Sequence, residues 1–268
     1  MRRSVLCALS CAVPSAAPPV ASAAPPTPGE AARAPFAARH RAEPHGGIVR
    51  AADTSAKGTG TVDDKAAIGC ADVDDDPNAY DSRRAERRVP AGSLIAWARL
   101  RRGGNPRVGG RGGRTLVAAY GKESEPLRRL RVRDGFETVG PRSGELRAAL
   151  DGHRCPKGTR GRLGVIAHDG DRRTSGDYPE VRTGLRETTG TGDSANSAND
   201  VLNSGIIEFG RAGTTRSPAA GNTLGYDSDV FDLRGALRNG ADRVHVRLGS
   251  REDTVRPGAP FPQADVRR

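Results

Sequence analysis

The sequence predicts an all-β fold: an incomplete antiparallel β-sandwich preceded by a signal peptide and a disordered tether. Short apolar runs recur with clusters of Gly, Pro, Asp and Asn between them, which is typical of antiparallel sheets. Several runs alternate apolar and polar residues with a period of two, as in residues 146–150 and 244–248. Leu, Ile, Val and Phe make up only about 17% of the chain, below the ~20% at which disorder becomes common, so a thin core is expected.

The first 23 residues have the features of a secretory signal peptide. The basic residues Arg2 and Arg3 precede an apolar stretch at residues 4–13 and a small-residue cleavage pattern at residues 21–23. The apolar stretch is shorter than the roughly 20 residues that span a bilayer, and no later run comes close, so no transmembrane anchor is expected. We therefore expect the protein to be secreted and extracellular, either released or associated with the cell wall.

The rest of the chain divides into a tether and one domain. Residues 24–65 are rich in Ala, Pro, Gly and Thr without periodicity, so they are predicted to be a disordered tether. Residues 66–268 are predicted to form a single β-sandwich domain. Its strands are expected in the apolar runs at residues 94–100, 115–120, 127–132, 146–150, 163–167, 201–209 and 244–248.

Cleavage of the signal peptide leaves two cysteines, Cys70 and Cys155. Disulfides persist in an oxidising compartment, and a bridge closing so long a loop stabilises by about 4–5 kcal/mol in the chain-entropy model. Whether the two cysteines pair is left open by the sequence.

Positive charge is concentrated in residues 83–133, which hold 15 Arg and Lys against 3 Glu. Such a block can contact the phosphate or sulfate groups of a polyanion, although a solvated, Arg-biased strand face is the simpler explanation. Only Trp97 and Tyr120 are available for base stacking, so nucleic acid is an unlikely partner. The candidate polyanion-binding residues are Arg99, Arg101, Arg102, Arg107, Arg111 and Arg114.

Acidic clusters suggest calcium, the single cofactor considered. Six oxygen-bearing residues lie within residues 72–81, but their spacing does not fit an EF-hand. A second set contains Asp227, Asp229 and Asp232, which are the candidate calcium ligands. Aspartate also stabilises turns through its own backbone, so turn chemistry explains each set without a metal.

Catalytic motifs are missing from the sequence. It has no Gly-x-Ser-x-Gly elbow, no His-Glu-x-x-His and no phosphate-binding glycine loop. His168 and Asp169 lie near Ser175, but ordinary surface residues explain them better than a triad does. We expect no enzymatic activity. A secreted hydrolase that uses acidic residues near positions 169–177 stays an alternative, because the separation of paired carboxylates cannot be read from sequence.

Several short sequence motifs occur in the order in which they are found in one protein family, among them residues 171–177, 199–204 and 222–232. Over roughly residues 69–264, the chain resembles uncharacterised secreted actinobacterial cell-envelope proteins that carry a β-sandwich domain of unknown function. The resemblance implies an exported, non-catalytic surface module that binds or scaffolds an unknown envelope component or glycan. It supplies no active-site residues.

The chain departs from these relatives at positions that affect the core. Arg101 and Arg102 occupy two aromatic places, and Arg133 and Arg256 stand where relatives have Trp. Between residues 108 and 115, a short Gly-Arg segment replaces a longer region with several strands. Loss of a core Trp typically costs about 3–5 kcal/mol, so the resemblance implies a shortened and partly degenerate copy.

The sequence thus favours a secreted, non-enzymatic β-domain of the cell envelope with a binding or scaffolding role. The first alternative is a basic secreted protein that binds polyanions through residues 83–133, and the second is the hydrolase. Ligand identity and oligomeric state are not determined by the sequence.

Overall fold

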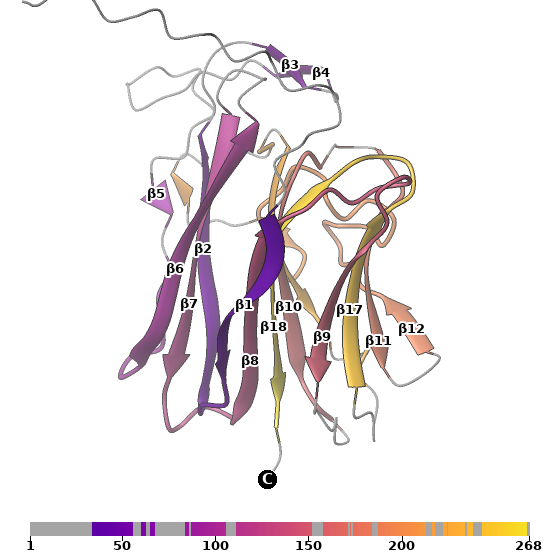
Figure 1. Cartoon of the computed structure of the whole chain (residues 1–268). Coiled ribbons are helices and arrows are strands. Elements are labelled where there is room, and N and C mark those ends of the chain that lie inside the picture. Colours follow the sequence, from indigo (N-terminus) through magenta and orange to yellow (C-terminus); the bar gives the residue numbers. More distant parts are fainter. Residues whose placement is uncertain are drawn as a thin grey trace, which may run out of the picture. The chain divides into compact units, whose positions relative to one another are not determined.

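Strands form the regular secondary structure of the protein in the part of the chain that the computed structural model describes (Figure 1). The described residues are 34–55, 60–62, 65–67, 84–85, 87–105, 111–151, 158–170, 172, 174–183, 187–212, 216–217, 222–223, 225–233, 235–237 and 243–266. The predicted all-β fold of packed antiparallel sheets is confirmed. Within these residues, no helix is both long and apolar enough to cross a membrane.

The largest sheet has seven strands in the order β1-β8-β18-β10-β16-β13-β14, and we call it the central sheet. All of its pairs are antiparallel except β13 with β16. Its strands are β1 (Ala34–Ala42), β8 (Arg128–Phe136), β18 (Arg256–Asp265), β10 (Gly161–His168), β16 (Tyr226–Asp232), β13 (Ile207–Glu208) and β14 (Arg211–Ala212).

Two smaller sheets are fully antiparallel. The four-stranded sheet has the order β12 (Glu187–Gly190), β11 (Asp177–Thr183), β17 (Arg243–Ser250) and β9 (Leu146–Asp151). The three-stranded sheet has the order β2 (Gly46–Ser55), β7 (Arg111–Gly121) and β6 (Leu94–Asn105). Two short pairs complete the fold, β15 (Arg216–Ser217) with β5 (Arg84–Ala85) and β3 (Gly60–Val62) with β4 (Lys65–Ala67).

The central sheet is covered on both faces. Successive side chains of a strand point to opposite faces, and β10 contributes to a different apolar cluster on each side. Leu163 and Val165 pack in a cluster with Val181 of the four-stranded sheet. Ile166 packs in a second cluster with Val117 of the three-stranded sheet. The central sheet therefore lies between the other two, as Figure 1 shows, and the predicted two-sheet sandwich gains a third layer.

Burial on both faces explains which strands the sequence pattern revealed. A strand covered on one face alternates in burial, as β11 does, whereas a strand covered on both faces is buried continuously. β16 is buried from Tyr226 to Phe231 and β18 from Pro257 to Ala264. Neither strand has a period-two pattern of apolar residues, and neither was among the expected runs.

Three prolines, Pro257, Pro260 and Pro262, lie within β18, although proline has no N–H to donate in a sheet. The ladder between β18 and β8 covers only Gln263, Ala264 and Asp265. The prolines precede this ladder, and all three are register partners of residues in β10.

The predicted tether at residues 24–65 was wrong over much of its length. Residues 34–42 and 46–55 form β1 and β2, which pair with β8 and β7. These Ala-rich strands carry scattered Arg and little apolar periodicity, and their partners lie far along the chain. The sheets therefore begin as early as Ala34, ahead of the predicted domain boundary at residue 66. Residues 1–33, which contain the predicted signal peptide, lie outside the described residues.

The Gly-Arg segment between residues 108 and 115, predicted to be a linker, contains the beginning of β7 at Arg111. β6 and β7 form an antiparallel pair in which Asn105 is opposite Arg111 and Arg101 is opposite Thr115. Residues 106–110 lie outside the described residues. The segment thus belongs in large part to the β6–β7 pair.

Replacement of Leu163 by alanine tests the two-sided burial of β10. Leu163 is 0% exposed, so Leu163→Ala should lower the free energy of unfolding by about 2–5 kcal/mol in urea titrations followed by Trp97 fluorescence. Leu100, at 54% exposed, is the matched control, and Leu100→Ala should change it by less than about 0.5 kcal/mol. Equal losses in the two variants would contradict the fold described above.

Candidate anion-binding site

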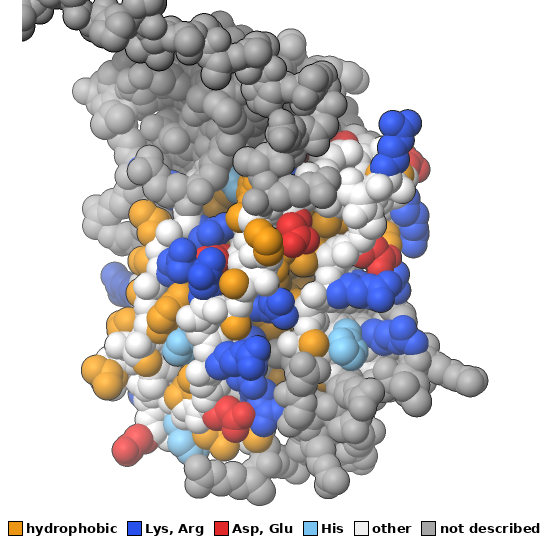
Figure 2. All heavy atoms as spheres, viewed as in Figure 1, with side chains coloured by type: hydrophobic (Ala, Val, Ile, Leu, Met, Phe, Trp, Pro, Cys, Tyr) orange, Lys and Arg blue, Asp and Glu red, His pale blue; other side chains and the backbone are white. Residues whose placement is uncertain are grey.

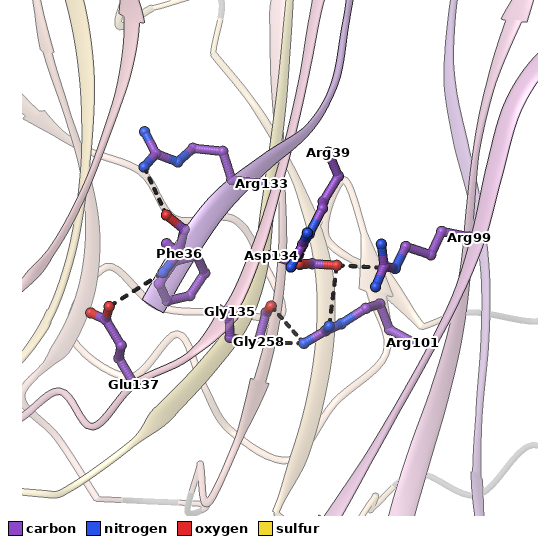
Figure 3. Close-up of polar contacts among 9 residues, drawn as sticks. All are labelled: Phe36, Arg39, Arg99, Arg101, Arg133, Asp134, Gly135, Glu137 and Gly258. Carbon is purple, nitrogen blue, oxygen red and sulfur yellow. Dashed lines mark hydrogen bonds and ion pairs between the residues drawn. The ribbon is translucent and has the colours of Figure 1, made fainter. Parts of the chain in front are cut away.

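Three arginines surround one buried carboxylate between the central and three-stranded sheets (Figure 3). Asp134 of β8 has a side chain that is only 2% exposed. Its Oδ1 contacts Nε of Arg39 from β1, and its Oδ2 lies 3.1 Å from Nε of Arg99 and 3.2 Å from Nη1 of Arg101, both from β6. We call these four residues the Asp134 cluster. It has two more positive than negative charges.

Strand alternation places the members of the cluster on the inner faces of their sheets. Leu130 and Val132 of β8 are buried in the second apolar cluster, and Asp134 continues the same face two residues later. On β6, Arg99 and Arg101 lie opposite the buried residues Val117 and Thr115 of β7. A carboxylate buried at this position requires compensating charge, which the arginines supply.

The three arginines differ in their exposure and in how many partners they have within the protein. Arg101 also donates to the carbonyl oxygens of Gly135 at 2.9 Å and Gly258 at 3.0 Å, and its side chain is 24% exposed. Arg39 and Arg99 have side chains that are 39% and 43% exposed. Each guanidinium carries five N–H donors, so Arg39 and Arg99 keep donors available to a ligand in solvent. Arg101 instead uses donors to connect β6 with the carbonyl groups of β8 and β18.

More positive charge lies around the cluster. Figure 2 shows Lys and Arg side chains grouped near the middle of the viewed face, where Figure 1 places β1. Arg41 of β1 is exposed. Arg133 of β8 donates to the carbonyl oxygen of Phe36 at 3.3 Å, while the Phe36 N–H donates to Glu137 at 3.4 Å (Figure 3).

Two of the six arginines predicted to bind a polyanion, Arg99 and Arg101, are brought together at Asp134. Arg99 and Arg101 lie on the inner face of the three-stranded sheet. Arg102 is opposite Arg114 in the β6–β7 register. Arg111 starts β7 and Arg107 lies outside the described residues.

Two members of the cluster were missed by sequence reasoning. Arg39 lies in the segment predicted to be a tether, and Asp134 follows the last residue of the basic block. Nothing in the sequence pairs Asp134 with residues of β1 and β6, because the contacts depend on how two sheets pack.

Three of the arginines at positions where the resemblance implies aromatic residues have polar contacts. Arg101 binds Asp134 and two carbonyl groups, and Arg133 binds the Phe36 carbonyl. Arg256 forms an ion pair with Asp169. Polar contacts thus occupy positions at which the resemblance implies apolar packing.

The three candidate calcium ligands are not brought together. Asp227 and Asp229 are 0% exposed and share one face of β16, whereas Asp232 is exposed and on the opposite face by alternation. Across the described parts of the chain, no three His, Cys, Asp or Glu side chains are grouped so that they could hold a metal ion. The hypothesis of a site at these three residues is therefore not supported.

Buried aspartates instead accept hydrogen bonds from the loop that precedes β13. Asp227 Oδ1 accepts the Gly205 N–H and Asp229 Oδ1 accepts the Ile207 N–H, each at 3.0 Å. Asp177 Oδ2 accepts the N–H groups of Val201 at 3.0 Å and Leu202 at 2.5 Å. The strand expected at residues 201–209 is thus mostly this loop, and only residues 207–208 belong to β13.

Burial shifts the pKa values of these groups. Burial raises the pKa of Asp177 to about 7, with a smaller contribution from the nearby Asp200 carboxylate. Burial also raises the pKa of Asp229 to about 8, and burial and the Asp229 charge raise the pKa of Asp227 well above its ordinary value. The pKa of His168 is lowered to about 4 by burial and then by the charges of Arg101 and Arg256.

The residues considered for a catalytic triad are otherwise engaged. His168 is 8% exposed, and its ring packs against those of Phe136 and Tyr226 with centroids 5.7 and 5.1 Å away. Asp169 pairs with Arg256. In the described residues, no hydrogen bond joins His168 to Asp169 or Ser175. Cys70 and Cys155, whose pairing the sequence leaves open, lie outside the described residues.

Comparisons with protein-family models, with curated proteins and with solved structures find no match to this chain.

Asp134→Asn should destabilise the protein far more than loss of one exposed arginine. The variant leaves Arg101 without its carboxylate, and breaking a buried pair costs about 3 kcal/mol. Arg39→Gln is the control and should cost less than about 1 kcal/mol, since exposed ion pairs contribute little. Urea unfolding measures both, and equal costs would show that Asp134 does not hold the sheets together.

The melting temperature should fall between pH 6.5 and about pH 8.5. The pKa values of Asp177 and Asp229 are higher in the folded chain than their ordinary value of 3.8, so the folded chain binds their protons more tightly. That stabilisation is complete below pH 3.8 and is lost as pH rises through about 7 and 8. The contribution of His168 is present above pH 6.5 and lost only as pH falls toward about 4.

Calorimetric melts across this pH range measure the effect, and Asp177→Asn should make the decrease smaller. A melting temperature that stays constant or rises would contradict the assignment of protonated, buried aspartates.

Proposed function

We propose that this chain is a secreted, non-enzymatic binding module of the cell envelope that holds an anionic polymer at the Asp134 cluster. The observation that carries the proposal is the excess positive charge there. Three guanidinium groups share one carboxylate, and the side chains of Arg39 and Arg99 are more than one-third exposed.

Guanidinium chemistry defines the class of ligand. Arginine forms paired hydrogen bonds with phosphate, sulfate or carboxylate groups, and binds them more strongly than neutral partners. Arg39 and Arg41 are both exposed residues of β1, so this strand adds positive charge near the cluster. A glycan or other envelope polymer bearing such groups is the proposed partner.

Nucleic acid fits this surface less well. Single-stranded nucleic acid relies on exposed aromatic rings for stacking. The Trp97 ring is already stacked on His40, with centroids 5.3 Å apart and planes 19° apart, and Tyr120 is only 6% exposed. The two aromatic residues of the basic block are therefore poor platforms for bases.

A non-enzymatic role agrees with the state of the acidic and histidine residues. Asp177, Asp227 and Asp229 each accept backbone N–H groups inside the fold, and His168 is packed between aromatic rings. These groups stabilise a loop and a core. Export, the other half of the proposal, rests on the signal-peptide features of residues 1–23.

Retention on a heparin column tests the polymer-binding proposal. The Arg39→Gln/Arg99→Gln double variant should elute at lower salt, and its affinity should depend on salt with a slope smaller by about two, one per lost anionic contact. Arg142→Gln/Arg147→Gln removes the same charge from exposed positions elsewhere and should change elution much less. Identical elution of the two double variants would rule out the Asp134 cluster as the binding site.

A further inference from the structure

A second site lies at the opposite end of β8 from the Asp134 cluster. A cavity of about 290 Å³ opens there between β8, β10, β16, β18 and the β13–β14 turn. Its lining includes Arg128, Arg160, Arg162, Phe209 and Asp232. Arg128 is six residues from Asp134, which along a strand corresponds to roughly 20 Å.

Positive charge in this cavity is only partly compensated. Arg128 pairs with Asp265 at 3.1 Å and with Glu125 at 3.2 Å. Arg160 and Arg162 make no ion pair with a carboxylate among the residues that the structure describes. The Arg162 guanidinium instead lies over the Phe209 ring, 5.0 Å from its centroid.

Phe209 occupies a position that is unusual for its residue type. It is the first central residue of the two-residue turn between β13 and β14, with φ of 52°, and Gly210 follows with φ of 74°. A turn with two positive φ values favours Asn-Gly, and a bulky side chain rarely adopts this conformation. The ring nevertheless lines the cavity and is 37% exposed. A strained residue held at a cavity is a mark of a functional site.

We propose that this cavity binds a single sugar unit that carries an acidic group, whether carboxylate, sulfate or phosphate. The exposed Phe209 ring packs against the apolar face of the sugar, and Arg160 and Arg162 bind the acidic group. Asp232 and Gln263 also line the cavity, and Gln263 Oε1 accepts the Ile48 N–H at 2.9 Å. The volume lies at the lower end of the range for ligand pockets, which suits one sugar and not a long oligomer.

This inference does not rest on the Asp134 cluster, because the two sites share no residue. A polymer held at one site and a terminal acidic sugar held at the other are separate binding events. Variants at one site therefore test it without touching the other.

Calorimetric titration of the full chain with glucuronate, glucose and acetate tests the inference. Glucuronate should bind saturably, and glucose and acetate should each bind at least about tenfold more weakly, because each lacks half of the recognised features. Phe209→Asn should weaken glucuronate binding about tenfold without lowering the melting temperature, since asparagine suits the turn. Arg162→Gln should weaken it to a similar extent.

Two controls locate the effect. Arg142→Gln removes an exposed positive charge elsewhere, and the Arg39→Gln/Arg99→Gln double variant disables the Asp134 cluster. Both should bind glucuronate as the parent chain does. The inference is overturned if glucuronate does not bind saturably, if acetate binds as well as glucuronate, or if Phe209→Asn and Arg162→Gln bind it unchanged.

Discussion

Coverage of the central sheet on both faces is the constraint on which the rest of the structure depends. Water does not reach the middle of β10, β16 and β18, so every polar group there needs a partner within the protein. For each β16 aspartate, Oδ1 meets this need by accepting a backbone N–H from the loop before β13. Asp134 of β8 meets it with three arginines. The contacts of the β16 aspartates order the loop before β13. The arginines around Asp134 bring positive charge to the edge of the packed sheets.

The arginines around Asp134 link the fold to the proposed function. One carboxylate needs one positive charge, yet packing of β1 and β6 around β8 brings three. Arg101 is held by carbonyl groups as well, which leaves Arg39 and Arg99 as the exposed pair. The same distinction separates the arginines of the cavity near Phe209, where Arg128 has carboxylate partners and Arg160 and Arg162 form no ion pair among the described residues.

The sequence predicts the strands with apolar runs or apolar alternation and misses those without such a pattern. β9 and β17 alternate apolar and polar residues because one face is covered, and both were expected at their observed positions. The aspartates of β16 suggest an exposed acidic loop, because the distant contacts that bury them are not visible in the local sequence. β1 and β2 read as a tether because Ala and Arg show no periodicity. Of the candidate site, Arg99 and Arg101 were expected from charge density alone, but Arg39 and Asp134 join them only through the packing of two sheets.

Residue-resolved hydrogen exchange, measured with and without heparin, tests the account most directly. Amides of β10 and β16 should exchange most slowly, because they open only when the whole fold opens, while β6 should exchange faster. Heparin should add protection in β1, β6 and β8 around Asp134. Rapid exchange in β10, or heparin protection confined to strands remote from Asp134, would contradict the claim that the doubly covered sheet creates the binding surface.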